Sequence, residues 1–87
     1  MNKNINLVDE NSKASIAERF YSIRHALNLS QNELAKLLNV TKQQVASIEQ
    51  SKRNPGVKLM MRLIDICAKN GIKVEAKFIR PDYFIND

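Results

Sequence analysis

The sequence predicts a small, mainly all-α domain, a bundle of four or five helices followed by one C-terminal β-strand. Apolar residues recur at intervals of three and four through most of the chain, which is the spacing of amphipathic helices. Just before three of the apolar repeats a serine or threonine is followed three residues later by glutamate or glutamine, the pair that forms a capping box where a helix starts. The apolar period changes to two only after residue 71, which indicates a strand.

We divide the chain by these patterns. Residues 1–13 are polar apart from Ile5, Leu7 and Val8, so we expect a flexible N-terminal arm. Residues 14–70 carry the helical patterns, residues 71–79 the pattern of a dimerising strand, and residues 80–87 form a tail. A chain of 87 residues can bury one modest core, which favours a single domain.

The first three helices each have a start signal. Ser15 with Glu18 predicts a first helix over about residues 13–27. The second helix is predicted after Ser30 and the third after Thr41, which is paired with Gln44. Between them Asn39 turns the chain, since asparagine tolerates the left-handed conformation better than most residues.

Residues 31–50 have the order of side chains that a helix-turn-helix needs to place its second helix in a DNA major groove. Small and apolar residues form the inner faces, namely Leu34, Ala35, Leu38, Val45 and Ile48. Gln43, Ser47 and Gln50 project on the opposite side, which is polar and uncharged. Such a face suits hydrogen bonding to base edges.

The segment after the third helix predicts a loop, a helix and a strand. Residues 51–54 form the loop, and Pro55 precedes a fourth helix that Gly71 ends. The apolar face of that helix consists of Leu59, Met60, Leu63, Ile64, Ile66 and Cys67. In the strand, Ile72, Val74, Ala76 and Phe78 alternate with charged residues.

A lone strand is unstable and needs a partner. Either the N-terminal segment INLV or the same strand of a second subunit could pair with it, and a symmetric pair would make a homodimer. The tail exposes Tyr83, Phe84 and Ile85; it could be disordered, pack on the dimer, or be a peptide that another protein recognises.

The net charge of +5 favours a polyanionic partner, and no segment is long and apolar enough to predict a membrane span. Lys52, Arg53, Lys58 and Arg62 cluster after the third helix; they are either a solvated basic patch or phosphate contacts. Cys67 is the single cysteine, which we interpret as a core residue of a cytoplasmic protein.

Nothing in the sequence favours an enzyme. His25 is the single histidine and is expected to be exposed, and no cluster has metal-ligand or catalytic-triad spacing. We therefore predict no catalytic residue, no metal site and no cofactor.

Residues 14–70 resemble the helix-turn-helix of the Cro/cI-like, or XRE, family of bacterial and phage repressors, which includes antitoxins of toxin–antitoxin operons. The resemblance rests on IRHALNLSQNELA, on VxxIE in the third helix, and on a basic loop that ends in NP before another helix. Asn39 replaces the glycine that is usual in the family. The resemblance implies a lambda-repressor-like fold and operator binding by a symmetric dimer.

The resemblance also implies roles for individual residues. Arg24 should meet Glu49, and such a pair would fix the angle of the third helix. Phosphate contacts should come from Gln31, Thr41, Lys52, Arg53 and Asn54. The side chains of the third helix that can reach bases are Lys42, Gln43, Gln44, Ser47 and Gln50.

Three settings fit this interpretation. The protein could be the antitoxin of a toxin–antitoxin operon, which binds double-stranded DNA at an inverted-repeat operator and also binds a toxin. It could be a stand-alone phage or chromosomal repressor. It could also be a protein-interaction module that has lost DNA binding, although the glutamine-rich third helix argues against this.

Overall fold

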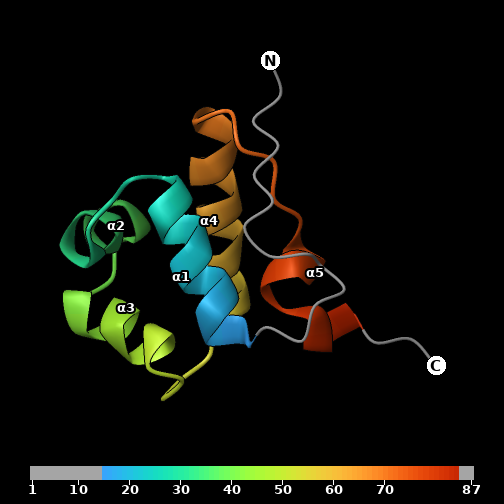
Figure 1. The fold of residues 1–87 in the computed structure, drawn as a ribbon, viewed down its shortest axis with the longest axis horizontal. Helices are drawn as coiled ribbons and strands as arrows, with labels where there is room; N and C mark the ends of the chain where they lie inside the picture. The colour runs from blue at the N-terminus through green and yellow to red at the C-terminus, as the bar shows by residue number, and fades with distance from the viewer. Residues whose placement is uncertain (1–14, 85–87) are drawn as a thin grey trace.

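Five α-helices and one short 3₁₀ helix make up the regular structure of residues 15–84, the part of the chain that this computed structural model describes (Figure 1). They are α1 (Ile16–Ala26), α2 (Gln31–Leu38), α3 (Lys42–Glu49), α4 (Val57–Lys69), α5 (Ala76–Ile79) and the 3₁₀ helix η1 (Pro81–Phe84). The prediction of a mainly helical bundle with four or five helices is confirmed for these residues.

All three predicted capping boxes are present. Ser15, Ser30 and Thr41 are the N-cap residues of α1, α2 and α3, and each side chain accepts a hydrogen bond from the backbone three residues on. In each box the glutamate or glutamine at that position accepts a hydrogen bond from the N-cap backbone in return. These bonds satisfy donors that a helix start otherwise leaves free, which explains why the helices begin at these residues.

Helices α1 and α4 lie in the middle of the molecule, with α2 and α3 on one side and α5 on the other (Figure 1). The core between them is almost wholly aliphatic, with one aromatic ring at Phe20. Cys67 is fully buried there, as expected, and burial raises the pKa of its thiol to about 11. The left-handed conformation of Gly71 (φ 74°) follows the end of α4, which also confirms the predicted helix end.

The predicted strand over residues 72–78 is wrong. Residues 72–75 have no regular structure, and the chain then forms α5, whose last residue Ile79 is fully buried in the core. The alternation correctly indicated which side chains point inward. A strand also needs a second strand to pair with its backbone N–H and C=O groups, and residues 15–84 contain none. The backbone instead bonds locally, since Phe78 N donates to Glu75 O and Arg80 N donates to Ala76 O.

The four residues expected to face a second subunit pack on the chain's own core. Ile72 is buried there, and Val74, Ala76 and Phe78 are half-buried against it. A dimer formed by pairing these strands is therefore not supported by the structure. The predicted N-terminal arm and the tail residues 85–87 lie outside the described residues, and in residues 15–84 no helix is long and apolar enough to cross a membrane.

Candidate nucleic-acid interface

Helices α2 and α3 form a helix-turn-helix around Asn39. Asn39 has φ 61° and ψ 44°, the left-handed conformation predicted for this turn. Its N–H donates to Lys36 O at 3.2 Å, and Val40 N donates to Ala35 O at 3.0 Å, so the turn uses the free carbonyls at the end of α2. Leu34, Ala35 and Leu38 are buried on one side of the turn and Val45 and Ile48 on the other, as predicted.

The outer face of α3 is open to solvent. Lys42, Gln43 and Gln50 are exposed, and Ser47 is half-buried. Gln44 differs from the others because its side chain belongs to the capping box: Gln44 Oε1 accepts from Thr41 N at 3.0 Å, and Gln44 N donates to Thr41 Oγ1 at 3.1 Å. Gln44 Oε1 is therefore already engaged, and a two-bond contact of this amide with adenine would require it to leave the helix start.

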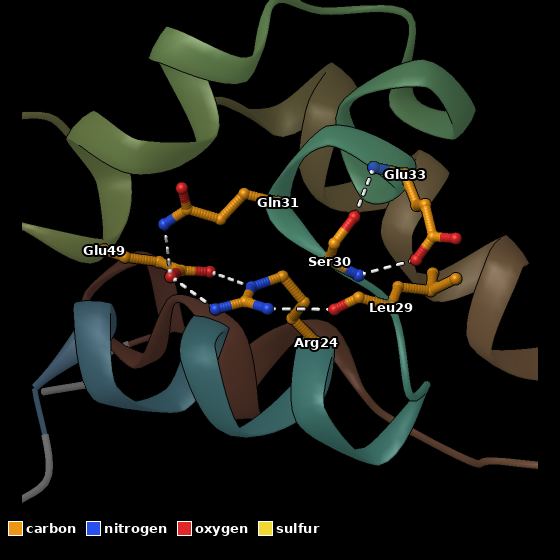
Figure 2. A network of polar contacts seen from close by, with 6 residues as sticks. All are labelled: Arg24, Leu29, Ser30, Gln31, Glu33 and Glu49. Carbon is orange, nitrogen blue, oxygen red and sulfur yellow. Dashed lines mark hydrogen bonds and ion pairs between the residues drawn. The ribbon is translucent and has the colours of Figure 1, made fainter.

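A bidentate ion pair joins α1 to the end of α3, as the resemblance implied (Figure 2). Arg24 Nε donates to Glu49 Oε2 at 2.6 Å, and Arg24 Nη2 donates to Glu49 Oε1 at 3.0 Å. The side chains are only 12% and 7% exposed. The hydrogen bonds to Glu49 raise the pKa of the Arg24 guanidinium above its usual range, so this charge is fixed at any physiological pH.

The same network reaches the start of α2 (Figure 2). Arg24 Nη1 donates to Leu29 O at 2.8 Å, and Gln31 Nε2 donates to Glu49 Oε1 at 3.0 Å. Beside it, hydrogen bonds from Ser30 lower the pKa of the Glu33 carboxyl, the backbone N–H having the largest effect. The ends of α1, α2 and α3 are thus held together by one carboxylate and one guanidinium.

Two of the expected phosphate contacts have hydrogen-bond partners within the protein. The Gln31 amide bonds to Glu49, and the Thr41 hydroxyl is engaged in the cap of α3. Thr41 is nevertheless exposed and Gln31 half-buried, both at helix starts where backbone N–H groups favour anions. Their predicted role is compatible with these positions and stays a prediction.

The basic residues after α3 gather around one hollow. A surface depression of about 260 Å³ lies between α3 and the start of α4, with Arg53, Asn54, Lys58 and Arg62 on its rim. Arg62 Nη1 donates to Leu38 O at 2.9 Å, which places this cation beside the end of α2. Lys52 lies in the same loop and is exposed. The sequence cluster is therefore also a cluster in space, next to the helix expected to read DNA.

Two buried arginines that contact or belong to the C-terminal segment were not singled out from the sequence. Arg19 and Arg80 are 2% and 6% exposed, and both donate to backbone carbonyls far along the chain. Arg19 Nη1 bonds to Phe78 O at 3.0 Å, and Arg80 Nη1 bonds to Pro55 O at 2.6 Å. A carbonyl acceptor leaves no signal in the sequence, so no residue pattern could have identified these contacts.

Comparison with known proteins agrees with this geometry. A family model described as helix-turn-helix matches residues 20–70, which include α2, the turn and α3. The chain is also 36% identical over 64 residues to an uncharacterised HTH-type transcriptional regulator of Methanocaldococcus jannaschii, a match that covers 74% of this chain and 89% of that protein. No solved structure matches the chain.

Proposed function

Since this chain belongs to the helix-turn-helix family, we propose that it is a sequence-specific DNA-binding regulator of transcription. The observation that carries the proposal is the exposed polar face of α3, held in a fixed orientation by the Arg24–Glu49 ion pair. The related archaeal protein is described as a transcriptional regulator, and the same role fits this chain.

In this proposal α3 enters the major groove. Gln43, Ser47 and Gln50 lie at intervals of four and three residues, so they share the outer face of the helix. Glutamine can form two hydrogen bonds with adenine through N6 and N7, and Lys42 can bond to guanine. Gln44 can form both hydrogen bonds with adenine only if its Oε1 releases Thr41, so we rank it below the other four residues.

Phosphates are bound on both sides of the reading helix. Gln31 and Thr41 are at the starts of α2 and α3, and Lys52, Arg53 and Asn54 are in the loop after α3. Such contacts set the register of the protein on DNA without reading its sequence.

We further propose that the protein acts as a homodimer on an inverted repeat. Two reading helices about 34–36 Å apart would meet half-sites about 10 base pairs apart, one turn of DNA. We do not place the contact between subunits at residues 72–78, because the apolar side chains of this segment pack on the core of their own chain. Light scattering with and without DNA would measure the assembly.

Selection from a randomised duplex library tests the reading face. The wild type should enrich one sequence family, and Gln43→Ala/Ser47→Ala should lose preference for it over scrambled DNA at fixed salt. Each good base contact discriminates by about 1–3 kcal/mol. The control is Asn32→Ala, which removes an exposed amide from α2 and should leave the specificity ratio unchanged. An unchanged ratio for the double variant would contradict readout by α3.

The most specific version of the proposal is an antitoxin that represses its own operon and neutralises a toxin. The resemblance of residues 14–70 to XRE-family proteins, which include antitoxins, supports it. A toxin-like reading frame beside this gene, whose product forms a complex with the protein, is the expected outcome. A solitary gene with a palindromic operator would favour the stand-alone repressor, and a wild type that binds no duplex would favour a protein-interaction module.

A further inference from the structure

The Arg80 side chain connects the C-terminal segment to the loop after α3. Its Nη1 donates to Pro55 O at 2.6 Å, while its Nε and Nη2 donate to the two oxygens of Asp82 at 3.0 and 2.6 Å. The guanidinium carbon lies 3.9 Å from the centre of the Tyr83 ring. The hydrogen bonds from Arg80 lower the pKa of the Asp82 carboxyl, so the pair stays ionised at neutral pH.

The acceptor of this bond lies where the basic loop ends. Pro55 is buried and directly follows Lys52, Arg53 and Asn54, all of which are exposed. At the other end of the loop, Lys52 N donates to Ser47 O at 2.9 Å, which joins the loop to α3. The loop is therefore held at both ends, by α3 and by Arg80.

The segment that carries Arg80 is itself fixed to the core. Ile79 is fully buried, and Arg19 of α1 donates to Phe78 O at 3.0 Å, with its guanidinium 4.9 Å from the centre of the Phe78 ring. The backbone that leads into Arg80 is therefore restrained by the contacts between α5 and α1. Pro55 O is thus linked to α1 through Arg80 and α5, by contacts that are buried or partly buried.

We propose that Arg80 is a positioning residue for DNA binding, which holds the loop of residues 51–54 where Lys52 and Arg53 contact phosphates. The inference rests on the proposed function and adds the C-terminal segment to the DNA-binding unit. Arg80 does not itself contact DNA, because it is only 6% exposed and its guanidinium is covered by Asp82, Pro55 and Tyr83. Its effect on binding is transmitted through the loop.

The salt dependence of binding to a short mixed-sequence duplex measures the number of phosphate contacts. Arg80→Ala should lower the salt slope by about one or more, because a loosened loop loses contacts that each contribute about one. The charge-matched control is Lys73→Ala, which removes an exposed cation at the far end of α4 and should change the slope less. In a Lys52→Ala/Arg53→Ala background, Arg80→Ala should have no further effect on the slope.

A second measurement follows the loop without DNA. In Arg80→Ala the carbonyl-carbon chemical shift of Pro55 should move as its hydrogen bond is lost, and amide relaxation of residues 52–54 should show greater mobility. Arg80→Lys keeps one donor for Pro55 O but cannot hold Asp82 with two bonds, so it should restore part of the wild-type slope. Thermal melts confirm that each variant is folded at the temperature used, and Arg80→Lys replaces Arg80→Ala if the latter is not.

The outcomes separate this inference from the proposed function. A lower slope, a more mobile loop and loss of the effect in the Lys52→Ala/Arg53→Ala background together support positioning by Arg80. The inference is overturned if the wild type binds the duplex and Arg80→Ala and Lys73→Ala have equal salt slopes, whether or not the loop becomes more mobile. A wild type that binds no duplex overturns the proposed function, and with it the inference.

Discussion

The carboxylate of Glu49 accepts hydrogen bonds from two side chains on other helices, and the Glu49 side chain is almost fully buried. Removing Arg24 would leave this charge with the Gln31 amide alone. We therefore expect Arg24→Ala to lower the free energy of unfolding by about 3–5 kcal/mol, the range for breaking a buried pair. Urea titration followed by circular dichroism gives this value.

The exposed pair of Lys69 and Asp65 supplies the control for that prediction. Its side chains are 74% and 63% exposed, at a distance of 3.1 Å between Lys69 Nζ and Asp65 Oδ2. Lys69→Ala should cost less than about 1 kcal/mol, because water screens the pair. Equal, small losses for Arg24→Ala and Lys69→Ala would show that burial of the first pair contributes nothing.

The Cys67 thiol should be inert in the folded protein. A free thiol has a pKa of about 8.5, whereas burial raises that of Cys67 to about 11. Between these values the unfolded state binds fewer protons than the folded state, so this group contributes a loss of stability as pH rises from about 9 to 11. A thiol reagent at about pH 8 should modify the unfolded chain much faster than the folded chain.

The pH dependence has its own control in Cys67→Ala. That variant loses the thiol contribution, so its unfolding free energy should fall less steeply above pH 9 than that of the wild type. Rapid modification of the folded wild type would show that the thiol is reached without unfolding.

The one polar contact between distant parts of the chain that was predicted, Arg24 with Glu49, joins two side chains. Arg24 and Glu49 were found through the resemblance, because both positions belong to its pattern. Arg19 and Arg80 bond to carbonyls 59 and 25 residues away, and every residue has a carbonyl. Which carbonyl lies within reach depends on the path of residues 72–84, and that path follows from tertiary packing.

The turn between α2 and α3 depends on the left-handed conformation of Asn39. An alanine there would meet the steric penalty of that conformation, so Asn39→Ala should cost about 1 kcal/mol or more, while Asn39→Gly should be close to neutral. Asn32→Ala, inside α2, is the control and should not destabilise, since alanine favours helix. Chemical denaturation of the three variants would measure the difference. Equal stability of Asn39→Ala and Asn39→Gly would contradict it.

Local signals predicted the first four helices but predicted a strand where the fifth helix, α5, lies. Capping boxes and turns act over three to five residues, so Ser15, Ser30 and Thr41 determine where their helices start whatever the rest of the chain does. The alternation after residue 71 correctly predicted that Ile72 faces inward. The backbone conformation of this segment depends on contacts with distant residues, such as the hydrogen bond that Arg19 of α1 donates to Phe78 O.

At the scale of the molecule, the C-terminal segment completes the single core. The structure places α5 on the side of α1 and α4 opposite to α2 and α3 (Figure 1), and Ile79 of α5 is fully buried in the core. The helix-turn-helix and α5 therefore lie on two sides of the same pair of helices.

This arrangement predicts that a chain ending at Gly71 is far less stable than the full chain. Ile79→Ala alone should cost about 2–5 kcal/mol, because its side chain is fully buried, whereas Val57→Ala, at a residue that is 56% exposed, should cost under about 0.5 kcal/mol. Truncation also removes buried Ile72 and the acceptor of Arg19, so its loss should exceed that of Ile79→Ala and approach the whole stability of a small domain. Urea unfolding of the three proteins beside the wild type would measure these losses. A truncated chain with the wild-type midpoint would show that residues 72–87 are an appendage, and α5 would then have no role in holding the DNA-binding loop.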